Sequence, residues 1–357
     1  MKKLQLSILL VLFAFFATAQ IGGMGVYQSL KLPPSARVAA LGGYQIAVMD
    51  NELALGFQNP SLLNPEMHKQ MSLSQVNYLA DVGFGFAGFG YNLDSNTTVL
   101  GGIQYVSYGD FTRTDEFGNT NGSFSGGDYN LVAGIGRKWR HNLSYGANLK
   151  IIYSNLEQYY SWGLATDLAL TYHRPDRNFT AALVARNLGF QFSSYSSTKE
   201  QLPVDLQLGL SQKLENAPFR FNLTFHHLNI PDITFVNPTQ QVQVISFNDD
   251  DDTDDPNKIA LAEKFGRHVS FGTEILLNKH LHFRIGYNHQ RRKEMLLPAS
   301  NTFSNNKGAV GYSWGFGLRV WKLHVDYGRV AHHIGGAANY FTITSNLSQF
   351  KKQEKAG

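Results

Sequence analysis

Apolar and polar residues alternate along most of the chain beyond residue 69. Successive side chains of a β-strand point to opposite sides, so each alternating segment has two distinct faces. In residues 143–153 these faces are Leu143, Tyr145, Ala147, Leu149, Ile151, Tyr153 and Ser144, Gly146, Asn148, Lys150, Ile152. The large apolar face suits lipid, and the small polar face suits a water-filled lumen.

Further segments carry the same alternation, some more regularly than others. They cover residues 160–172, 204–214, 219–225, 269–277, 281–289, 310–320, 70–78, 84–92, 97–108, 129–138, 179–188, 323–328 and 340–347. A soluble sandwich or lipocalin-like barrel also alternates, but faces rich in Gly, Ser and Asn could not form its core. We therefore predict an all-β fold: an antiparallel outer-membrane β-barrel of about 14 strands, preceded by a short helical plug-like segment.

The plug-like segment is centred on residues 30–60, the one long part of the mature chain that does not alternate. Two prolines and a serine favour a helix start, and paired glycines favour its end, which predicts a helix over residues 36–41. Placed in the lumen or at the periplasmic mouth, its arginine would need a partner, either the later aspartate or an inward barrel carboxylate. A loosely ordered periplasmic arm is the alternative. The motif comprises Pro33, Pro34, Ser35, Ala36, Arg37, Gly42, Gly43, Asp50, Asn59 and Pro60.

The two ends of the chain read differently from its middle. Residues 1–19 combine two lysines, an apolar run and small residues at Ala17 and Ala19, which is typical of a cleaved secretory signal peptide. An uncleaved anchor is the alternative, but the run is short for a bilayer span. We assign residues 20–68 to the plug-like segment, 69–350 to the barrel and 351–357 to a polar tail.

Composition supports the same class of protein. Charged residues make up 16% of the chain, below the roughly 25% of ordinary soluble proteins. Aromatic residues reach 13%, while the mean hydropathy is only −0.23, as expected where apolar and polar positions average out. The chain has no cysteine, which excludes disulfides, a lipid anchor on cysteine and thiolate metal sites. A net charge of +4 is too small to indicate a nucleic-acid partner.

The connections predict the orientation of the barrel. Those after even-numbered strands are short, whereas the connections over residues 109–127, 189–202, 229–266 and 290–308, after odd-numbered strands, are long. Outer-membrane barrels keep short turns in the periplasm and long loops outside. Both chain ends are therefore expected in the periplasm.

The predicted lumen face carries charges of both signs. Its bases are Lys150, Arg186, Arg220, Arg284 and Arg319, and its acids are Asp128, Asp167, Asp205, Glu274 and Asp326. Confined charges are expected to pair with one another, although a selectivity ring for an anionic solute is an alternative. We also expect Arg at an outward Leu149 or Leu168 to impair assembly, and Arg at an inward Asn148 or Gln207 to be tolerated.

Searches for catalytic and metal motifs give little. His280 and His282 share a strand face, but no spacing supplies a third ligand. The acidic run 248–255 could offer oxygens to Ca²⁺, yet it lacks the glycine and final glutamate of an EF-hand, which favours a solvated loop. Because no GxSxG, HExxH or ordered nucleophile and base occurs, we predict no enzymatic activity, catalytic residue, metal or cofactor.

One long loop carries a candidate docking surface. Residues 257–265 have the apolar spacing of a short amphipathic helix, and a second loop adds a basic run. Such a stripe either packs onto the barrel rim or helps to bind a partner at the cell surface. The candidate docking residues are Ile259, Leu261, Phe265, Arg291, Arg292 and Lys293.

Several stretches closely resemble the PorV/PorQ family of outer-membrane barrels in the type IX secretion system, itself similar to the long-chain fatty-acid transporter barrel. They are LPPSARVAALGG (32–43), NPSLLNPEMHKQMSLSQVNYLADV (59–82), GANLKIIYSNLEQY (146–159), ATDLALTYH (165–173), NFTAALVARNLG (178–189), APFRFNLTFHHL (217–228), RIGYNHQRRKE (284–294) and YFTITSNLSQF (340–350). The resemblance implies a 14-stranded barrel in outer-membrane lipid, without enzymatic activity. It also implies a place in the cargo attachment complex, holding the surface protein PorZ near PorU and PorV.

Two functions follow from these observations. The first is a membrane anchor and docking base for a surface partner. The second is a transporter of a hydrophobic or anionic small molecule, as the similarity to fatty-acid transporters would suggest. A transporter needs an apolar tunnel or lateral opening, whereas the predicted inward faces are small and polar.

Overall fold

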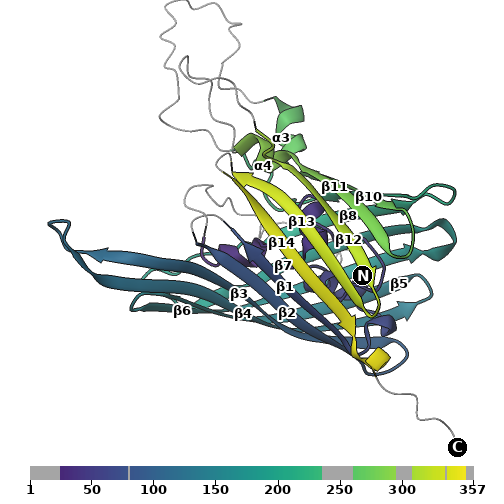
Figure 1. Cartoon of the computed structure of the whole chain (residues 1–357), viewed down its shortest axis with the longest axis horizontal. Coiled ribbons are helices and arrows are strands. Elements are labelled where there is room, and N and C mark those ends of the chain that lie inside the picture. The colour runs from purple at the N-terminus through teal and green to yellow at the C-terminus, as the bar shows by residue number, and fades with distance from the viewer. Residues whose placement is uncertain (1–24, 79–80, 235–259, 295–307, 334–335, 351–357) are drawn as a thin grey trace, which may run out of the picture.

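The computed structural model describes residues 25–78, 81–234, 260–294, 308–333 and 336–350. Fourteen antiparallel strands form one closed barrel in which each strand pairs with its sequence neighbours and β1 closes on β14 (Figure 1). The strands are β1 Gln70–Asn77, β2 Gly83–Asn92, β3 Thr97–Thr114, β4 Thr120–Arg140, β5 Leu143–Leu156, β6 Tyr159–Arg174, β7 Phe179–Ser193, β8 Asp205–Lys213, β9 Phe219–Phe225, β10 Val269–Leu276, β11 Leu281–Asn288, β12 Tyr312–Val320, β13 Leu323–His333 and β14 Gly336–Asn346. The predicted fold class is confirmed.

The two faces of the strands also follow the prediction. Burial alternates strictly along β1, and the outward Leu149 and Leu168 are 50% and 52% exposed. Their inward neighbours Asn148 and Asp167 are buried. A closed wall with a continuous apolar exterior is the arrangement that lipid requires, because no strand edge or backbone group is left unpaired.

One of the expected loops is largely strand, and a second begins as strand. The segment 109–127 contains the ends of β3 and β4, which run past the rest of the wall as a long projecting hairpin (Figure 1). Phe111 and Phe124 stack across it with ring centroids 5.2 Å apart. Strand β7 likewise extends to Ser193, inside the expected loop 189–202. Cross-strand pairing and stacking extend β3 and β7 beyond residues 108 and 188, where the alternation places their ends.

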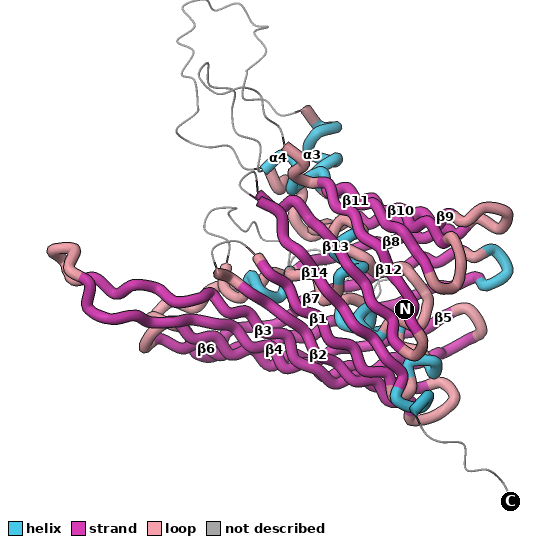
Figure 2. The backbone as a smooth tube through the Cα atoms, in the orientation of Figure 1, coloured by secondary structure: helices cyan, strands magenta, loops and turns pink. Residues whose placement is uncertain are grey.

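The described part of the plug-like segment, residues 25–69, lies inside the barrel (Figure 2). Its elements are α2 Ala36–Ala40 and the 3₁₀ turns η1 Gln28–Lys31, η2 Leu53–Phe57, η3 Pro60–Leu62 and η4 Pro65–Met67. Helix α2 begins as predicted, with the Ser35 side chain accepting from the backbone of Val38. It ends at Gly42 and Gly43, whose φ angles of 92° and 91° favour glycine.

This plug, meaning residues 25–69 throughout, runs along the lumen from one end to the other. Tyr27 bonds Ser161 near the β5–β6 hairpin, at the end that carries the long connections. Pro60 lies against Gly146 near the start of β5, at the end with the short turns. The placement of both termini in the periplasm stays a prediction, because residues 1–24 and 351–357 lie outside the described residues.

Small inward residues receive the plug rather than water. A Cβ added at Gly146 would lie 2.5 Å from the Pro60 carbonyl carbon, and one at Gly328 would lie 2.5 Å from the Ala36 carbonyl oxygen. Glycine is therefore required where the plug backbone touches the wall. The expectation of a water-filled lumen was wrong for this reason, and so was the expected tolerance of Arg at Asn148 or Gln207, both of which are buried.

Two short helices lie at the end with the long connections: α3 Leu261–Arg267 and α4 His289–Glu294. Helix α3 continues past the predicted end at residue 265, and residues 257–259 lie outside the described ranges, as does the acidic run 249–255. Among the helices that the structure describes, none is long and apolar enough to cross a lipid bilayer.

Candidate functional site

A buried network of charges joins the plug to the barrel wall at Arg37. The Arg37 guanidinium lies 2.6 Å from Asp50 and 2.9 Å from Glu52, both in the plug. It also makes two bonds of 2.8 and 2.9 Å to Glu274 on β10. Both partners expected from the sequence, Asp50 and an inward carboxylate, are therefore present together, and the pairing prediction is confirmed.

The network continues along the wall from Glu274. Arg220 on β9 lies 2.8 Å from Glu274 and 3.3 Å from Asp50. Arg284 on β11 lies 3.1 Å from Glu274 and also pairs with Asp326 on β13. In total, three arginines face four carboxylates: Arg37, Arg220, Arg284 and Asp50, Glu52, Glu274, Asp326.

This network closes the lumen instead of lining an open one. Glu274 and Asp326 have no exposed area, and only 1% of Arg284 is exposed. A buried charge is stable only when it keeps its oppositely charged partners. Withdrawing α2 would therefore remove the Arg37 guanidinium from Glu274 and Asp50. The expected pairing of inward charges is confirmed here, and the arrangement does not form a selectivity ring around a solute path.

A second contact fixes the other end of the plug. Asn59 donates to the Ile46 carbonyl at 2.6 Å and to Thr171 on β6 at 3.0 Å, while Ser61 lies 2.7 Å from the same threonine hydroxyl. Pro60 between them touches the wall at Gly146. Asn59 and Pro60, grouped with the plug motif from sequence, thus bind plug to wall.

A third polar cluster lies on the wall beside a strand irregularity. Lys150 pairs with Asp167 at 2.7 Å and donates to Asn187 at 2.8 Å. Asn187 has a φ of 58°, and the β6–β7 register shifts beside it. This bulge turns the Asn187 side chain into the lumen, where it satisfies a buried lysine.

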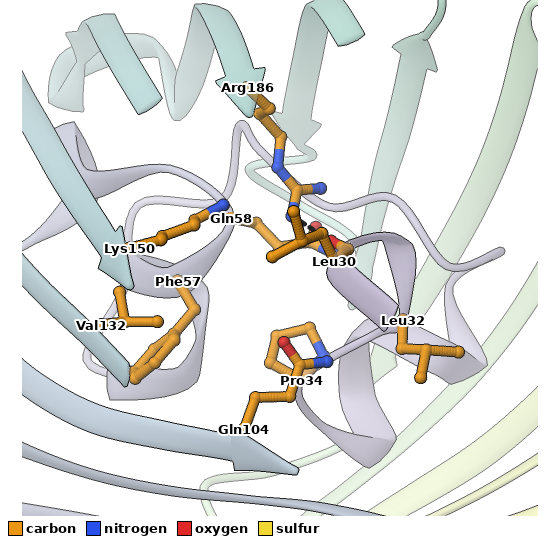
Figure 3. A pocket seen from close by; sticks show the side chains of 9 residues that line it. All are labelled: Leu30, Leu32, Pro34, Phe57, Gln58, Gln104, Val132, Lys150 and Arg186. Atoms are coloured by element: carbon orange, nitrogen blue, oxygen red, sulfur yellow. Dashed lines mark hydrogen bonds between the residues drawn. The ribbon is translucent and has the colours of Figure 1, made fainter. Parts of the chain in front are cut away.

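The space left between plug and wall is small here. Figure 3 shows Arg186 and Lys150 reaching toward the plug from the wall, with Gln58 and Leu30 opposite. The cavity that they line has a volume of about 10 Å³, room for about one water molecule. Arg186 donates to the Leu30 carbonyl at 3.3 Å. No small organic solute fits at this position.

The remaining members of the plug motif have structural roles. Pro33 and Pro34 are buried and lead into α2, and the Ala36 backbone N–H donates to Thr342 on β14 at 2.8 Å. Ser35 also donates to Glu52 at 2.9 Å. Within the described ranges, no group of three or more His, Cys, Asp or Glu side chains could hold a metal ion.

The candidate docking residues occupy a ledge, defined here as helices α3 and α4 with the Asp232 segment below them. Figure 1 shows the two helices side by side, and Glu263 joins them through Lys293 at 3.0 Å and His289 at 3.2 Å. Lys264 pairs with Asp232 at 2.7 Å. The ledge is thus an ordered surface tied by ion pairs.

The exposed face of this ledge is partly apolar. Leu261 is 84% exposed and Phe265 is 61% exposed, one helical turn apart on α3. Arg292 donates to the carbonyls of Gly308 and Val310. Arg291 faces the interior of the barrel mouth, and Ile259 lies outside the described residues.

We expect acid to loosen the ledge. Burial would raise the pKa of the Glu263 carboxyl, but bonds from Lys293 and His289 outweigh burial and hold this pKa below its usual value. Bonds from Lys264 and Thr234 lower the pKa of Asp232 to about 2. Both carboxylates therefore stabilise the ledge at pH values above their ordinary pKa of about 4. This stabilisation is lost as the pH falls toward 2.

The chain lacks cysteine, so a fluorophore can be attached to a single Leu261→Cys variant. Its anisotropy should fall between pH 5.5 and pH 2. A label at Lys279→Cys, in the short turn between β10 and β11, is the control and should not change. Constant anisotropy at Leu261→Cys, or an equal fall at both labels, would contradict the role assigned to Glu263 and Asp232.

The closed antiparallel wall, its apolar exterior and its inserted plug define the class: a plugged transmembrane β-barrel of the kind found in outer membranes. No protein-family model matches the sequence, and no curated protein does. Among solved structures, the Ralstonia pickettii toluene transporter TbuX has a similar fold, with a TM-score of 0.51 and 12% identity over 90% of this chain and 100% of that chain.

Two further solved structures are similar at lower scores. The Pseudomonas putida toluene transporter TodX gives a TM-score of 0.48 with 13% identity, covering 88% of this chain and 96% of that chain. A Pseudomonas aeruginosa FadL homologue gives 0.48 with 10% identity, covering 88% and 98%. At such identities the likeness to TbuX concerns the fold.

Proposed function

We propose that this protein is a non-enzymatic outer-membrane barrel that anchors a surface partner in the type IX attachment complex. The partner is a PorZ-like protein, held near PorU- and PorV-like components. The observation that carries the proposal is the plug, which occupies the lumen and is bonded to β10 through Arg37, to β9 through Asp50 and to β14 through Thr342. A filled barrel is a rigid support for other proteins.

The ledge supplies the surface for this partner. Leu261 and Phe265 together present two large exposed apolar side chains on an ordered helix, and Lys293 adds positive charge beside them. Exposed apolar groups rimmed by charges are typical of protein-binding sites. The identity of the partner comes from the sequence resemblance alone.

Transport of a hydrophobic or anionic small molecule is the second candidate. The fold likeness to the toluene transporter TbuX supports this candidate directly, whereas the attachment role depends on the sequence resemblance. Transport would require the plug to move or a path to open through the wall, because the cavity beside Lys150 and Arg186 admits no organic solute.

Substituting the exposed apolar pair tests the attachment role. In a Leu261→Glu, Phe265→Glu double variant, we expect the barrel to fold in the outer membrane while the PorZ-like partner is released into the medium. Burying two carboxylates in an apolar contact costs far more free energy than leaving them in water. The measurement is the partner's surface level by immunoblot, together with its recovery in a pull-down of the barrel.

The control is Phe117→Glu at the tip of the β3–β4 hairpin, where the side chain is 82% exposed. Point variants are sharper than removing residues 231–263, because that deletion also removes Glu263 and the buried Ile233. Normal retention of the partner by the double variant would overturn this docking site. A deletion strain that anchors cargo normally but fails to take up toluene would favour transport.

A further inference from the structure

A pocket of about 260 Å³ opens at the end of the barrel that carries the long connections. The plug forms its floor with Lys31, Pro33 and Tyr44, and the wall and α4 form its sides with His227 and Arg291. The pocket is distinct from the Arg37 network and from the exposed face of the ledge. Its volume is near the lower end of small-molecule sites, about 300 Å³.

Two cations face this pocket. On α4, Lys293 pairs with Glu263, but the side chain of Arg291 points into the pocket. Among the described residues, no carboxylate lies within ion-pair distance of the Arg291 side chain. The same holds for Lys31 on the plug. An unpaired cation held in a partly enclosed site favours an anionic ligand.

Two acids lie close to these cations, and each already has bonds of its own. Glu294 also lines the pocket, and one of its oxygens accepts from Gln290 at 2.8 Å. Asp205 lies behind the pocket, where its carboxylate accepts from the His227 backbone and from Gln207. The groups that line the pocket therefore remain cationic on balance, with two bases against one acid.

His227 lines the wall of the pocket with its ring. It is only 5% exposed, and its Nε2 atom has no hydrogen-bond partner among the described residues. Its Nδ1 atom lies 2.7 Å from Nδ1 of His226, whose ring stacks on Tyr44 at a centroid distance of 4.2 Å. With almost no accessible surface, the Nε2 nitrogen is out of reach of a group in the open pocket, so the polar contacts of the site come from Lys31 and Arg291.

We propose that this pocket binds a small organic anion. Its carboxylate or phosphate group lies between Lys31 and Arg291 and accepts charge-assisted hydrogen bonds from both. Its ring or short aliphatic body packs on Pro33, Tyr44 and Tyr78, which line the same space. This binding is independent of whether the ledge holds a surface partner.

Calorimetric titration of the purified full-length protein in detergent tests the proposal with three probes of similar shape. Benzoate carries the carboxylate, phenyl phosphate carries the phosphate, and benzyl alcohol is neutral. We expect at least one anion to bind at least about tenfold more tightly than benzyl alcohol, since charge-assisted bonds are about twice as strong as neutral ones. The preferred anion identifies which acidic group the site takes.

Two variants locate the binding. Arg291→Gln and Lys31→Gln should each weaken the preferred anion by about tenfold or more, whereas Lys293→Gln, on the same helix but paired with Glu263, should leave binding unchanged. Arg291 lies on a helix at the mouth of the barrel and not in the plug. The binding measured for Arg291→Gln therefore stays interpretable even if Lys31→Gln disturbs the plug. Equal binding of all three probes, absence of binding, or binding unaffected by Arg291→Gln would overturn the proposal.

Discussion

Replacing Glu274 with glutamine should lower the free energy of unfolding of the plugged barrel by about 3–5 kcal/mol. The Glu274 carboxylate is fully buried and bonds Arg37, Arg220 and Arg284. The amide keeps the shape but removes the charge, so the buried Arg37 and Arg284 and the partly exposed Arg220 lose their shared anion, and one amide N–H₂ faces donors. The measurement is the urea midpoint, the concentration at which half of the purified protein in detergent is unfolded. The folded fraction is read from the change in gel mobility that heating causes.

A matched control is available on the surface. Arg174→Gln removes an exposed ion pair with Asp176 in the connection after β6 and should leave the midpoint unchanged. A second measurement separates the plug from the wall, because Glu274→Gln should also speed protease cleavage within residues 36–59. If Glu274→Gln unfolds at the same urea concentration as the parent protein, the network does not hold the plug.

Placing Arg at Leu149 should destabilise the assembled barrel by about 2–4 kcal/mol. Leu149 is outward, 50% exposed and in the middle of β5, where a charge would face the centre of the bilayer. The cost falls to about 0–1 kcal/mol near the membrane surface. Tyr145→Arg, on the same outward face near the start of β5 with a 45% exposed side chain, is therefore the matched control.

The fraction of folded protein after refolding into lipid vesicles measures both variants. Equal loss at Leu149→Arg and Tyr145→Arg would contradict the depth assigned to β5. Asn148→Arg does not serve as the tolerated control once expected of it, because the Asn148 side chain donates to the Gly56 carbonyl of the plug at 3.1 Å. An arginine there would collide with the plug.

Local patterns in the sequence were enough to predict the wall and helix α2. Alternation depends only on neighbours two residues apart, and the start at Ser35 and the end at Gly42 depend on residues within one turn. The sequence predicted that Arg37 could pair with an inward carboxylate, but it did not single out Glu274 among the candidates. Their separation of 237 positions is beyond any local pattern.

The parts that sequence analysis missed depend on contacts between distant segments. Glu52 was not singled out, although it lies two residues from Asp50 and shares Arg37 with it. The inward glycines were taken as lining for water, yet Gly146 and Gly328 match the path of the plug backbone. Small residues on a strand face indicate a close neighbour as readily as they indicate solvent, and only the fold distinguishes the two.

The position of the plug has a consequence for the closure of the barrel. Strands β1 and β14 form the seam of the wall, paired from Gln70 with Asn346 to Asn77 with Asn339. Helix α2 lies inside the wall against β12, β13 and β14, and Ala36 and Ala39 belong to one apolar cluster with Val76 of β1 and Tyr340 of β14. The plug also bonds both strands of the seam, because the Ala36 backbone donates to Thr342 on β14 and the Leu53 backbone donates to Gln70 on β1. The seated plug therefore bridges the seam, so that plug insertion and the pairing of β14 with β1 stabilise each other.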